Sequence, residues 1–307
     1  MGSGKSKILV TAADLASQAL AFLSDYDVVY AGLAPQESDL VGLMQKHDPI
    51  GVIVRYGRIT ANVINAGKSL KAISKHGSGI DTIDVEAAKQ KGIVVCAAIG
   101  VNAAAVAEHT IALMLACAKS VPAMNARMHS GNWDKATHKS LELNGRTLGL
   151  IGLGAIGQRV ALIAAAMGMK VIGYDPFVKN LPENIQLTTL DAIWEQADVI
   201  SLHCPLTNDN KNLLDAQALA RVKRGVIVVN TARGGLVDEQ ALLMAVRSGH
   251  VAVAGLDSFQ QEPLPENHPF YTERNIVLTP HIVEVITDAY VNMGLTSVRN
   301  LLGHLAL

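Results

Sequence analysis

The sequence predicts an α/β protein made of two doubly wound parallel-sheet domains with a cleft between them. Two series of short apolar runs alternate with helical stretches, one over residues 7–100 and one from Arg146 onward. Such alternation is typical of parallel sheets, because each strand is followed by a helix that returns the chain to the same edge. A chain of 307 residues, half of them hydrophobic, is long enough to bury two cores.

The composition argues against several classes of protein. The chain is 17% charged with a formal net charge of −1, so no overall attraction to nucleic acid or to an anionic membrane is expected. No apolar run approaches the roughly 20 residues that span a bilayer, and no apolar stretch follows Met1–Ser6 as in a secretory signal. Cys96, Cys117 and Cys204 lie in apolar segments without metal-ligand spacing. We therefore expect a cytoplasmic protein without a bound metal and without nucleic-acid or membrane partners.

The first series predicts five strands and four helices. The strands are expected at Lys7–Thr11, Asp27–Tyr30, Gly51–Val54, Lys71–Lys75 and Ile93–Cys96. The helices are expected at Ala13–Asp25, Glu37–Lys46, Thr60–Ala66 and Val85–Lys91. A long helix that is apolar on most faces, and hence buried, is then predicted over Asn102–Ser120, followed by a polar, loop-like segment over Met124–Asn144.

The second series predicts six strands with helices between them, as in a complete nucleotide-binding fold. The strands are expected at Thr147–Ile151, Val171–Tyr174, Val199–Leu202, Val226–Asn230, Val251–Gly255 and Ile276–Leu278. A last helix, at about Ile286–Leu302, follows these strands and is expected to return to the first domain.

A glycine-rich turn joins the first strand of this series to a helix predicted over Gln158–Met169. Gly152, Gly154 and Gly157 have the spacing of a dinucleotide-binding turn, and Asp175 ends the next strand about 20 residues later. The first glycine permits the tight turn, the second lets a pyrophosphate approach the backbone, and the third lets the helix pack against the strand. Asp175 can accept hydrogen bonds from ribose hydroxyls and would repel a 2′-phosphate, which favours NAD over NADP.

These observations divide the chain into two Rossmann-like domains. Residues 101–284 are predicted to form the NAD-binding domain, and residues 1–100 with 285–307 the substrate-binding domain. Around the glycines, Ala155 and Ile156 are also expected to contact the cofactor.

Three polar residues follow strands of the second series. Arg233 lies in a turn of small residues and presents a planar group suited to a carboxylate. His281, oriented by the carboxylate of Glu262, would work as an acid–base pair. Ligands of doubly wound sheets bind outside the carboxyl ends of the strands, so a carboxylate clamp and a proton donor are expected there.

Several segments together resemble the NAD-dependent D-2-hydroxyacid dehydrogenase family, which includes phosphoglycerate, glycerate/hydroxypyruvate and D-lactate dehydrogenases. They are Gly152–Gly157, Leu202–Thr207, Asn230–Glu239 and Thr279–His281, with Lys75–Asp81 and Asn102–His109 in the first half. The resemblance implies reversible, NAD(H)-dependent reduction of a small 2-oxo acid, of the hydroxypyruvate, glyoxylate or phosphohydroxypyruvate type, to the D-2-hydroxy acid.

The resemblance also implies a role for each site residue. Arg233 would bind the substrate carboxylate and carbonyl, and His281, supported by Glu262, would donate the proton to the carbonyl oxygen. Asp257 would hold the nicotinamide carboxamide. The other cofactor contacts that it implies are His203, Cys204, Pro205, Thr207, Thr231 and Ala232. The other substrate contacts that it implies are Arg55, Ser78, Gly79 and Asn102. The segment Met124–Asn144, with Trp133, matches the arm through which members of the family form homodimers, although a solvated loop would have the same composition.

Two departures from the family leave the substrate open. Small residues usually follow the histidine, but here Val283 and Glu284 add bulk and a negative charge. Glu284 either hydrogen-bonds a substrate hydroxyl or points to solvent in the first turn of the last helix. Arg55 and Arg58, by contrast, suit an anionic substrate tail. An NAD(H)-sensing protein with little turnover, like the corepressors related to this family, is the alternative function.

Overall fold

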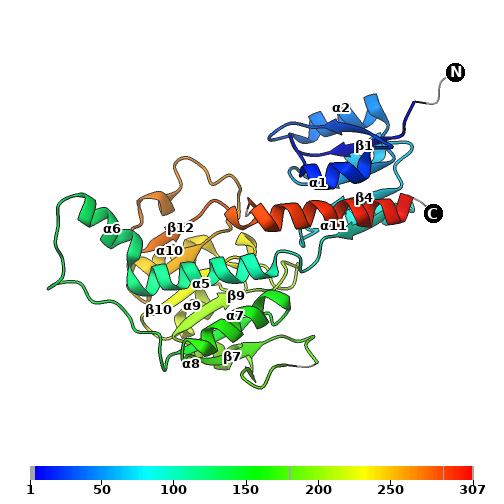
Figure 1. Cartoon of the computed structure of the whole chain (residues 1–307). Helices are drawn as coiled ribbons and strands as arrows, with labels where there is room; N and C mark the ends of the chain where they lie inside the picture. Colours follow the sequence, from blue (N-terminus) through cyan, green and yellow to red (C-terminus); the bar gives the residue numbers. More distant parts are fainter. Residues whose placement is uncertain (1–3, 180, 286, 306–307) are drawn as a thin grey trace. The chain divides into compact units, whose positions relative to one another are not determined.

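The computed structural model describes residues 4–179, 181–285 and 287–305, and the side chains of residues 284–287 lie outside that description. The chain divides into two compact units (Figure 1). Unit 1 comprises residues 1–102 and 284–307, and unit 2 comprises residues 103–283. Each unit contains one parallel sheet, so the predicted fold class of two parallel-sheet α/β domains is confirmed.

Unit 1 is built on a five-stranded parallel sheet in the order β2-β1-β3-β4-β5. The strands are β1 (Lys7–Val10), β2 (Asp27–Tyr30), β3 (Gly51–Val54), β4 (Ala72–Lys75) and β5 (Val94–Ala97). All residues of β3 and β4 are buried, as expected for inner strands that are covered on both faces. The predicted strands agree with these bounds to within one residue at either end.

The described residues of unit 1 contain six complete helical segments. They are α1 (Ser17–Leu20), the 3₁₀ helix η1 (Ala21–Leu23), α2 (Glu37–His47), α3 (Ala61–Ala66), α4 (Val85–Gln90) and α11 (Thr287–Leu305). The helix predicted over Ala13–Asp25 was too long, because the chain enters regular helix only at Ser17 and tightens into a 3₁₀ turn after Leu20. The last helix packs against β3, β4 and β5, as its predicted return to this domain requires.

Unit 2 contains a seven-stranded parallel sheet in the order β12-β11-β10-β9-β6-β7-β8. The strands are β6 (Thr147–Ile151), β7 (Lys170–Tyr174), β8 (Gln186–Leu187), β9 (Val199–Leu202), β10 (Val226–Asn230), β11 (Val251–Leu256) and β12 (Ile276–Leu278). The prediction of six strands missed β8, because its two residues are exposed and carry no apolar pattern. The chain runs outward from β6 to β8 and returns on the other side with β9. This reversal is the topological switch point at which such sheets bind ligands.

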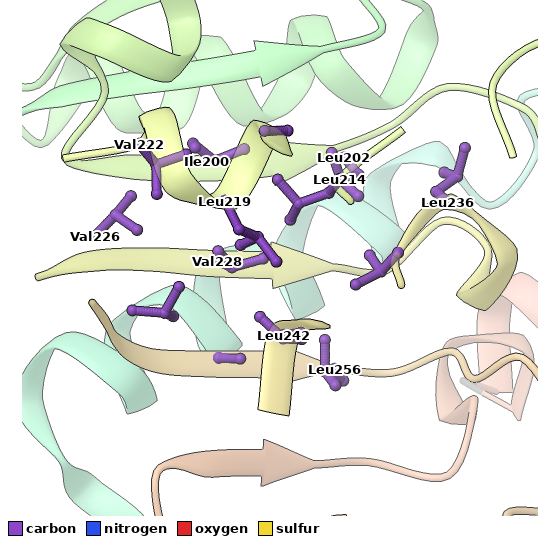
Figure 2. Packing of buried hydrophobic residues seen from close by; sticks show 14 of the residues in the cluster. Ile200, Leu202, Leu214, Leu219, Val222, Val226, Val228, Leu236, Leu242 and Leu256 are labelled. Atoms are coloured by element: carbon purple, nitrogen blue, oxygen red, sulfur yellow. The ribbon is translucent and has the colours of Figure 1, made fainter. Parts of the chain in front are cut away.

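Helices and apolar side chains cover both faces of the unit 2 sheet. The helices are α5 (Ala103–Lys119), α7 (Ala155–Ala166), α8 (Leu190–Gln196), α9 (Ala216–Arg221) and α10 (Glu239–Arg247). Alternate residues of the strands point into one hydrophobic cluster, in which Leu202, Val228 and Leu256 come from neighbouring strands (Figure 2). Helix α5 packs against β10, β11 and α7, and much of it is buried.

Among the described residues, no single helix is long and apolar enough to cross a membrane. Helices α5 and α6 (Val121–His129) form a bent pair. Only when the two are taken together are they long and apolar enough to span a membrane, by length and composition. The burial of α5 against the sheet accounts for its apolar composition.

Helix α6 corrects the prediction of a loop-like segment over Met124–Asn144. Its first turn contains Pro122, whose fixed φ suits that position, and Arg127 and His129 lie in the last turn, where cations are favourable. No residue of α6 is buried, so the apolar periodicity that reveals most helices is absent. Most of the segment from Ser130 to Asn144 lies outside regular helix and strand.

Candidate active site

The glycine turn after β6 can exist only without side chains at two positions. Gly152 has φ +97°, and a Cβ there would lie 2.6 Å from the backbone nitrogen of Cys204. A Cβ at Gly157 would lie 2.2 Å from the carbonyl oxygen of Gly152. A Cβ at Gly154, by contrast, would have no atom within 4 Å. Two glycines therefore permit close backbone packing, and the third leaves open space above the turn.

That open space lies at the N-terminus of α7. The helix begins at Ala155, and no side chain caps its first N–H groups. Uncapped N–H groups and the positive end of the helix dipole favour a bound phosphate. Ala155, Ile156 and Gly157 form this first turn, so the residues present fit the pyrophosphate of a dinucleotide.

Asp175, directly after β7, is held beside the same turn. Its Oδ2 accepts a hydrogen bond from the backbone N–H of Leu153 at 2.8 Å, and its Oδ1 accepts one from Phe177 at 2.8 Å. A carboxylate oxygen can accept more than one hydrogen bond, so each retains capacity for a hydroxyl group. The position at the end of the strand and the two backbone bonds are consistent with the predicted ribose contact.

The predicted cofactor residues after β9 and β10 lie at the same edge of the sheet. His203 shares a 2.9 Å hydrogen bond with Ser201, and burial lowers the pKa of its imidazole to about 4, so the ring is neutral. Burial, with the nearby Asp175, raises the pKa of the Cys204 thiol to about 11. Thr231 is buried, and its hydroxyl lies 2.7 Å from that of Thr110. These three residues therefore present neutral, weakly reactive side chains at this edge of the sheet. Pro205, Thr207 and Ala232 lie in the adjoining loops.

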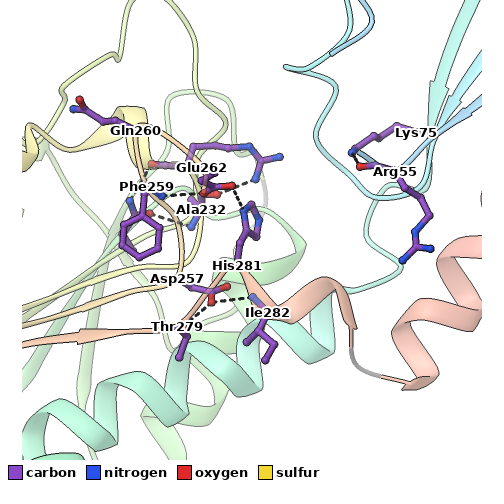
Figure 3. A network of polar contacts seen from close by, with 12 residues as sticks. Arg55, Lys75, Ala232, Asp257, Phe259, Gln260, Glu262, Thr279, His281 and Ile282 are labelled. Carbon is purple, nitrogen blue, oxygen red and sulfur yellow. Dashed lines mark hydrogen bonds and ion pairs between the residues drawn. The ribbon is translucent and has the colours of Figure 1, made fainter. Parts of the chain in front are cut away.

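Glu262 and His281 form an ion pair in unit 2 (Figure 3). The Nδ1 atom of His281 lies 2.8 Å from Oε2 of Glu262, and Oε1 of Glu262 accepts the backbone N–H of Phe259 at 2.9 Å. His281 has φ +50°, a left-handed conformation that is uncommon for a residue with a side chain. Such backbone strain is concentrated at functional sites. Because Nδ1 contacts Glu262, proton exchange between the ring and a ligand is expected at Nε2.

Glu262 is ionised in this environment. Its partial burial alone would raise the pKa of the carboxyl, but the hydrogen bond and charge of His281, the Phe259 N–H and the charge of Arg233 together lower it. A carboxylate that stays ionised at neutral pH favours the protonated form of the imidazole beside it.

Arg233 lies in a turn that two residues shape. The side chain of Asn230 donates to the carbonyl oxygen of Arg233 at 2.9 Å and accepts the N–H of Ala232 at 3.0 Å. A Cβ at Gly234 would lie 1.9 Å from the carbonyl carbon of Phe259, so only glycine lets this turn pack on the Phe259–Glu262 loop. Sequence reasoning did not assign positioning roles to Asn230 and Gly234. The small residues around the arginine were the available signal.

Asp257, which follows β11, is 1% exposed and lies within a network of polar contacts. Its Oδ1 accepts the Thr279 hydroxyl at 2.6 Å and the Ile282 N–H at 3.1 Å, and it lies 3.4 Å from Nε2 of His109. Thr279 and Ile282 flank His281, so this carboxylate anchors the histidine segment. Its contact with a nicotinamide carboxamide stays a prediction. His109 and Thr279 were missing from the predicted site residues.

The predicted substrate residues of unit 1 form two groups. The Ser78 hydroxyl donates to Asn102 Oδ1 at 3.2 Å and accepts the N–H of Gly100 at 3.2 Å, so Ser78, its neighbour Gly79 and Asn102 lie together. Arg55 belongs to the second group, where its Nη1 donates to Asp14 at 2.6 Å.

The residues after His281 are only partly described. Val283 is 3% exposed, so its bulk is taken up by packing. The side chain of Glu284 lies outside the described part of the chain. No group of three or more potential metal ligands occurs in the described residues.

Comparisons with known proteins identify relatives of the chain. Residues 111–283 match the NAD-binding domain of D-isomer-specific 2-hydroxyacid dehydrogenases. A hydroxypyruvate reductase of Thermotoga maritima is 40% identical over 274 residues, 89% of each chain. A D-3-phosphoglycerate dehydrogenase of Methanocaldococcus jannaschii is 41% identical over 280 residues, which are 90% of this chain but 53% of the relative.

Similarity extends to solved structures. A D-lactate dehydrogenase from Aquifex aeolicus, complexed with NAD and lactic acid, superposes with a TM-score of 0.86 at 28% identity. The match covers 98% of this chain and 96% of that one. The chain therefore spans nearly the full length of some relatives and about half the length of the phosphoglycerate dehydrogenases that it matches.

The lowered pKa of Glu262 predicts how the free energy of unfolding depends on pH. A carboxyl with a depressed pKa in the folded state stabilises the fold above its unfolded pKa and loses that contribution as pH falls through the folded pKa. Glu262→Gln should therefore destabilise the protein at pH 7 and much less near pH 3, as measured by urea unfolding. Glu266→Gln, at an exposed position nearby, is the control. If Glu262→Gln lowered the free energy of unfolding by the same amount at both pH values, the result would contradict the ion pair.

Proposed function

This chain belongs to the D-isomer-specific 2-hydroxyacid dehydrogenase family, and from that premise we propose that it reduces small 2-oxo acids of the hydroxypyruvate, glyoxylate or phosphohydroxypyruvate type to D-2-hydroxy acids. It is an NAD-dependent oxidoreductase. The observation that carries the proposed chemistry is the 2.8 Å pair of His281 and Glu262, with the charge of Arg233 acting on the same carboxylate.

The proposed reaction needs a hydride, a proton and a clamp for the substrate. When bound, NADH supplies the hydride, and the open turn at Gly154 and the first turn of α7 would hold its pyrophosphate. Arg233 would bind the substrate carboxylate through two parallel N–H donors. The carbonyl oxygen gains a negative charge as the hydride adds to the carbon, and the Arg233 cation stabilises that charge.

His281 would supply the proton. Its imidazolium form donates the proton from Nε2 to the carbonyl oxygen, which becomes the hydroxyl of the product. Glu262 accepts the Nδ1 hydrogen bond throughout and so keeps the ring in one orientation. In the reverse direction the neutral ring takes the hydroxyl proton as a general base.

Arg55, Ser78, Gly79 and Asn102 complete the proposed substrate contacts. The Ser78–Asn102 hydrogen bond supports a role for these two residues as one unit. Location in the cytoplasm is also part of the proposal, and the three free cysteines support it.

Replacing His281 tests the proton donor. His281→Ala should lower kcat for hydroxypyruvate by roughly 10²- to 10⁴-fold, the usual contribution of a positioned acid. Affinity for NADH, measured by fluorescence titration, should stay unchanged, since the glycine turn is intact. His304→Ala, at an exposed histidine of α11, should keep wild-type rates. Near-normal turnover without His281 would refute the assignment. Binding of NADH by wild type without turnover of any 2-oxo acid would favour the NAD(H)-sensing alternative.

Replacing Asp175 tests cofactor choice. Asp175→Ala removes the carboxylate that would repel a 2′-phosphate, so the ratio of kcat/KM for NADH to that for NADPH should fall by about tenfold or more. Asp209→Ala, at an exposed carboxylate elsewhere in unit 2, is the control. An unchanged ratio would remove Asp175 from the ribose site.

The segment Met124–Asn144 is proposed to mediate homodimer formation. Apolar side chains are unusually exposed there, with Trp133 76% and Met128 52% exposed. Large exposed apolar groups on a folded protein commonly mark interaction surfaces.

Replacing Trp133 tests the dimer. Trp133→Ser should increase the fraction of monomer in sedimentation velocity measurements, because the side chain loses the apolar surface that a partner would bury. Phe177→Ser changes an aromatic residue that is 87% exposed outside this segment, and should have no effect on assembly. A wild-type protein that is monomeric at all concentrations would overturn the proposal.

A further inference from the structure

Arg55, directly after β3, is held by a carboxylate and two aromatic rings. Its Nη1 donates to Oδ1 of Asp14 at 2.6 Å and to the Asp14 carbonyl oxygen at 3.0 Å. The guanidinium carbon lies 5.1 Å from the ring centroid of Tyr56 and 4.7 Å from that of Tyr290. Only 8% of the Arg55 side chain remains exposed, so the cation is held in one orientation.

Asp14 is itself oriented by the last helix. The hydroxyl of Tyr290, in α11, donates to Oδ2 of Asp14 at 2.8 Å. That bond has the largest effect on the pKa of Asp14 and lowers it; burial acts in the opposite direction, and the bond and charge of Arg55 lower the pKa further. The pKa therefore lies below its ordinary value, and the group is ionised at neutral pH. Its side chain is 68% exposed. A ligand that reaches Arg55 from solvent therefore also meets this negative charge.

Other charged and titratable groups lie close to Arg55. Lys75 is buried and donates from Nζ to the Arg55 carbonyl oxygen at 3.0 Å (Figure 3). Burial, aided by the charge of Arg55, lowers the pKa of His76 to about 4, so this ring is neutral. Glu37 lies near Arg58, the second arginine of the loop. Hydrogen bonds from Thr60 and Asn62 lower the pKa of Glu37 most, and the charge of Arg58 lowers it further. Asp14 is thus the carboxylate that contacts the Arg55 guanidinium, and its exposed side chain places a negative charge beside it.

We propose that Asp14 makes the enzyme selective for 2-oxo acids whose carboxylate is their only charged group, such as hydroxypyruvate and glyoxylate, over phosphorylated 2-oxo acids. The inference rests on the proposed function and on Arg55 as a substrate contact. A phosphate adds between one and two negative charges at neutral pH, and these would be repelled by Asp14. A hydroxyl at the same place adds no charge and can accept a hydrogen bond from the guanidinium.

The test compares kcat/KM for hydroxypyruvate and 3-phosphohydroxypyruvate in wild type and Asp14→Asn. Wild type should prefer hydroxypyruvate. The variant should shift the ratio toward the phosphorylated substrate by about threefold or more at low salt, a size suited to an exposed charge. The shift should shrink as ionic strength rises, because salt screens exposed charges. A shift in the ratio that was caused only by altered packing would not depend on ionic strength in this way.

Two further variants separate charge from position. Asp25→Asn removes an exposed carboxylate elsewhere in unit 1 and should leave the ratio unchanged. Tyr290→Phe removes the bond to Asp14 but keeps the negative charge, so its shift in the ratio should be smaller than that of Asp14→Asn. Thermal unfolding of each variant verifies that it is folded.

The outcomes are distinct. A wild-type preference for the phosphorylated substrate, or a ratio in Asp14→Asn equal to that in Asp25→Asn, would overturn the role of Asp14. If the ratio shifted as much in Tyr290→Phe as in Asp14→Asn, the effect would come from the orientation of the Asp14 side chain and not from its charge. That result would likewise overturn the proposal. Absence of turnover with every 2-oxo acid in wild type, with NADH bound, would instead defeat the proposed function.

Discussion

Parallel alignment of the strands in unit 2 is the constraint on which the site depends. All seven strands run in one direction, so their carboxyl ends meet at one edge of the sheet. The glycine turn and Asp175 follow β6 and β7, on one side of the switch point. Residues distant in sequence, including Arg233, Asp257 and His281, follow the neighbouring strands β10, β11 and β12. An antiparallel strand among these would direct its terminal residue to the opposite edge.

Close backbone approach is the second requirement, and glycine meets it at specific positions. Gly152 lies against the backbone of the loop after β9, and Gly234 lies against the Phe259–Glu262 loop. In both places a Cβ would separate two loops that carry site residues. The contact at Gly234 brings the loop of Glu262 close to the turn of Arg233, whose charge helps to lower the pKa of the Glu262 carboxyl. The absence of a side chain at Gly234 thus affects the pKa of Glu262, a residue distant in the sequence.

In unit 1, charge compensation determines what an arginine can recognise. Arg55 alone would attract any anion, but Asp14 contacts it directly, and the hydrogen bond from Tyr290 orients Asp14 and lowers its pKa. Of the two arginines that suggested an anionic substrate tail in the sequence, Arg55 is thus in direct contact with a carboxylate. On the proposal made above, the charge of Asp14 decides which substrate charge is tolerated.

The sequence by itself determined the fold class, most strand bounds, the dinucleotide-binding turn and the Glu262–His281 pair. These depend on local signals, namely apolar runs, glycine spacing and polar residues directly after strands. Tertiary structure alone decided the features without such signals. Helix α6 buries no side chain and β8 is only two residues long, so neither has a hydrophobic pattern. The contact between Asp14 and Arg55 joins residues 41 positions apart, and that between Asp14 and Tyr290 joins residues 276 apart. Pairing over such separations depends on how β3 and α11 pack, which no local pattern in the sequence specifies.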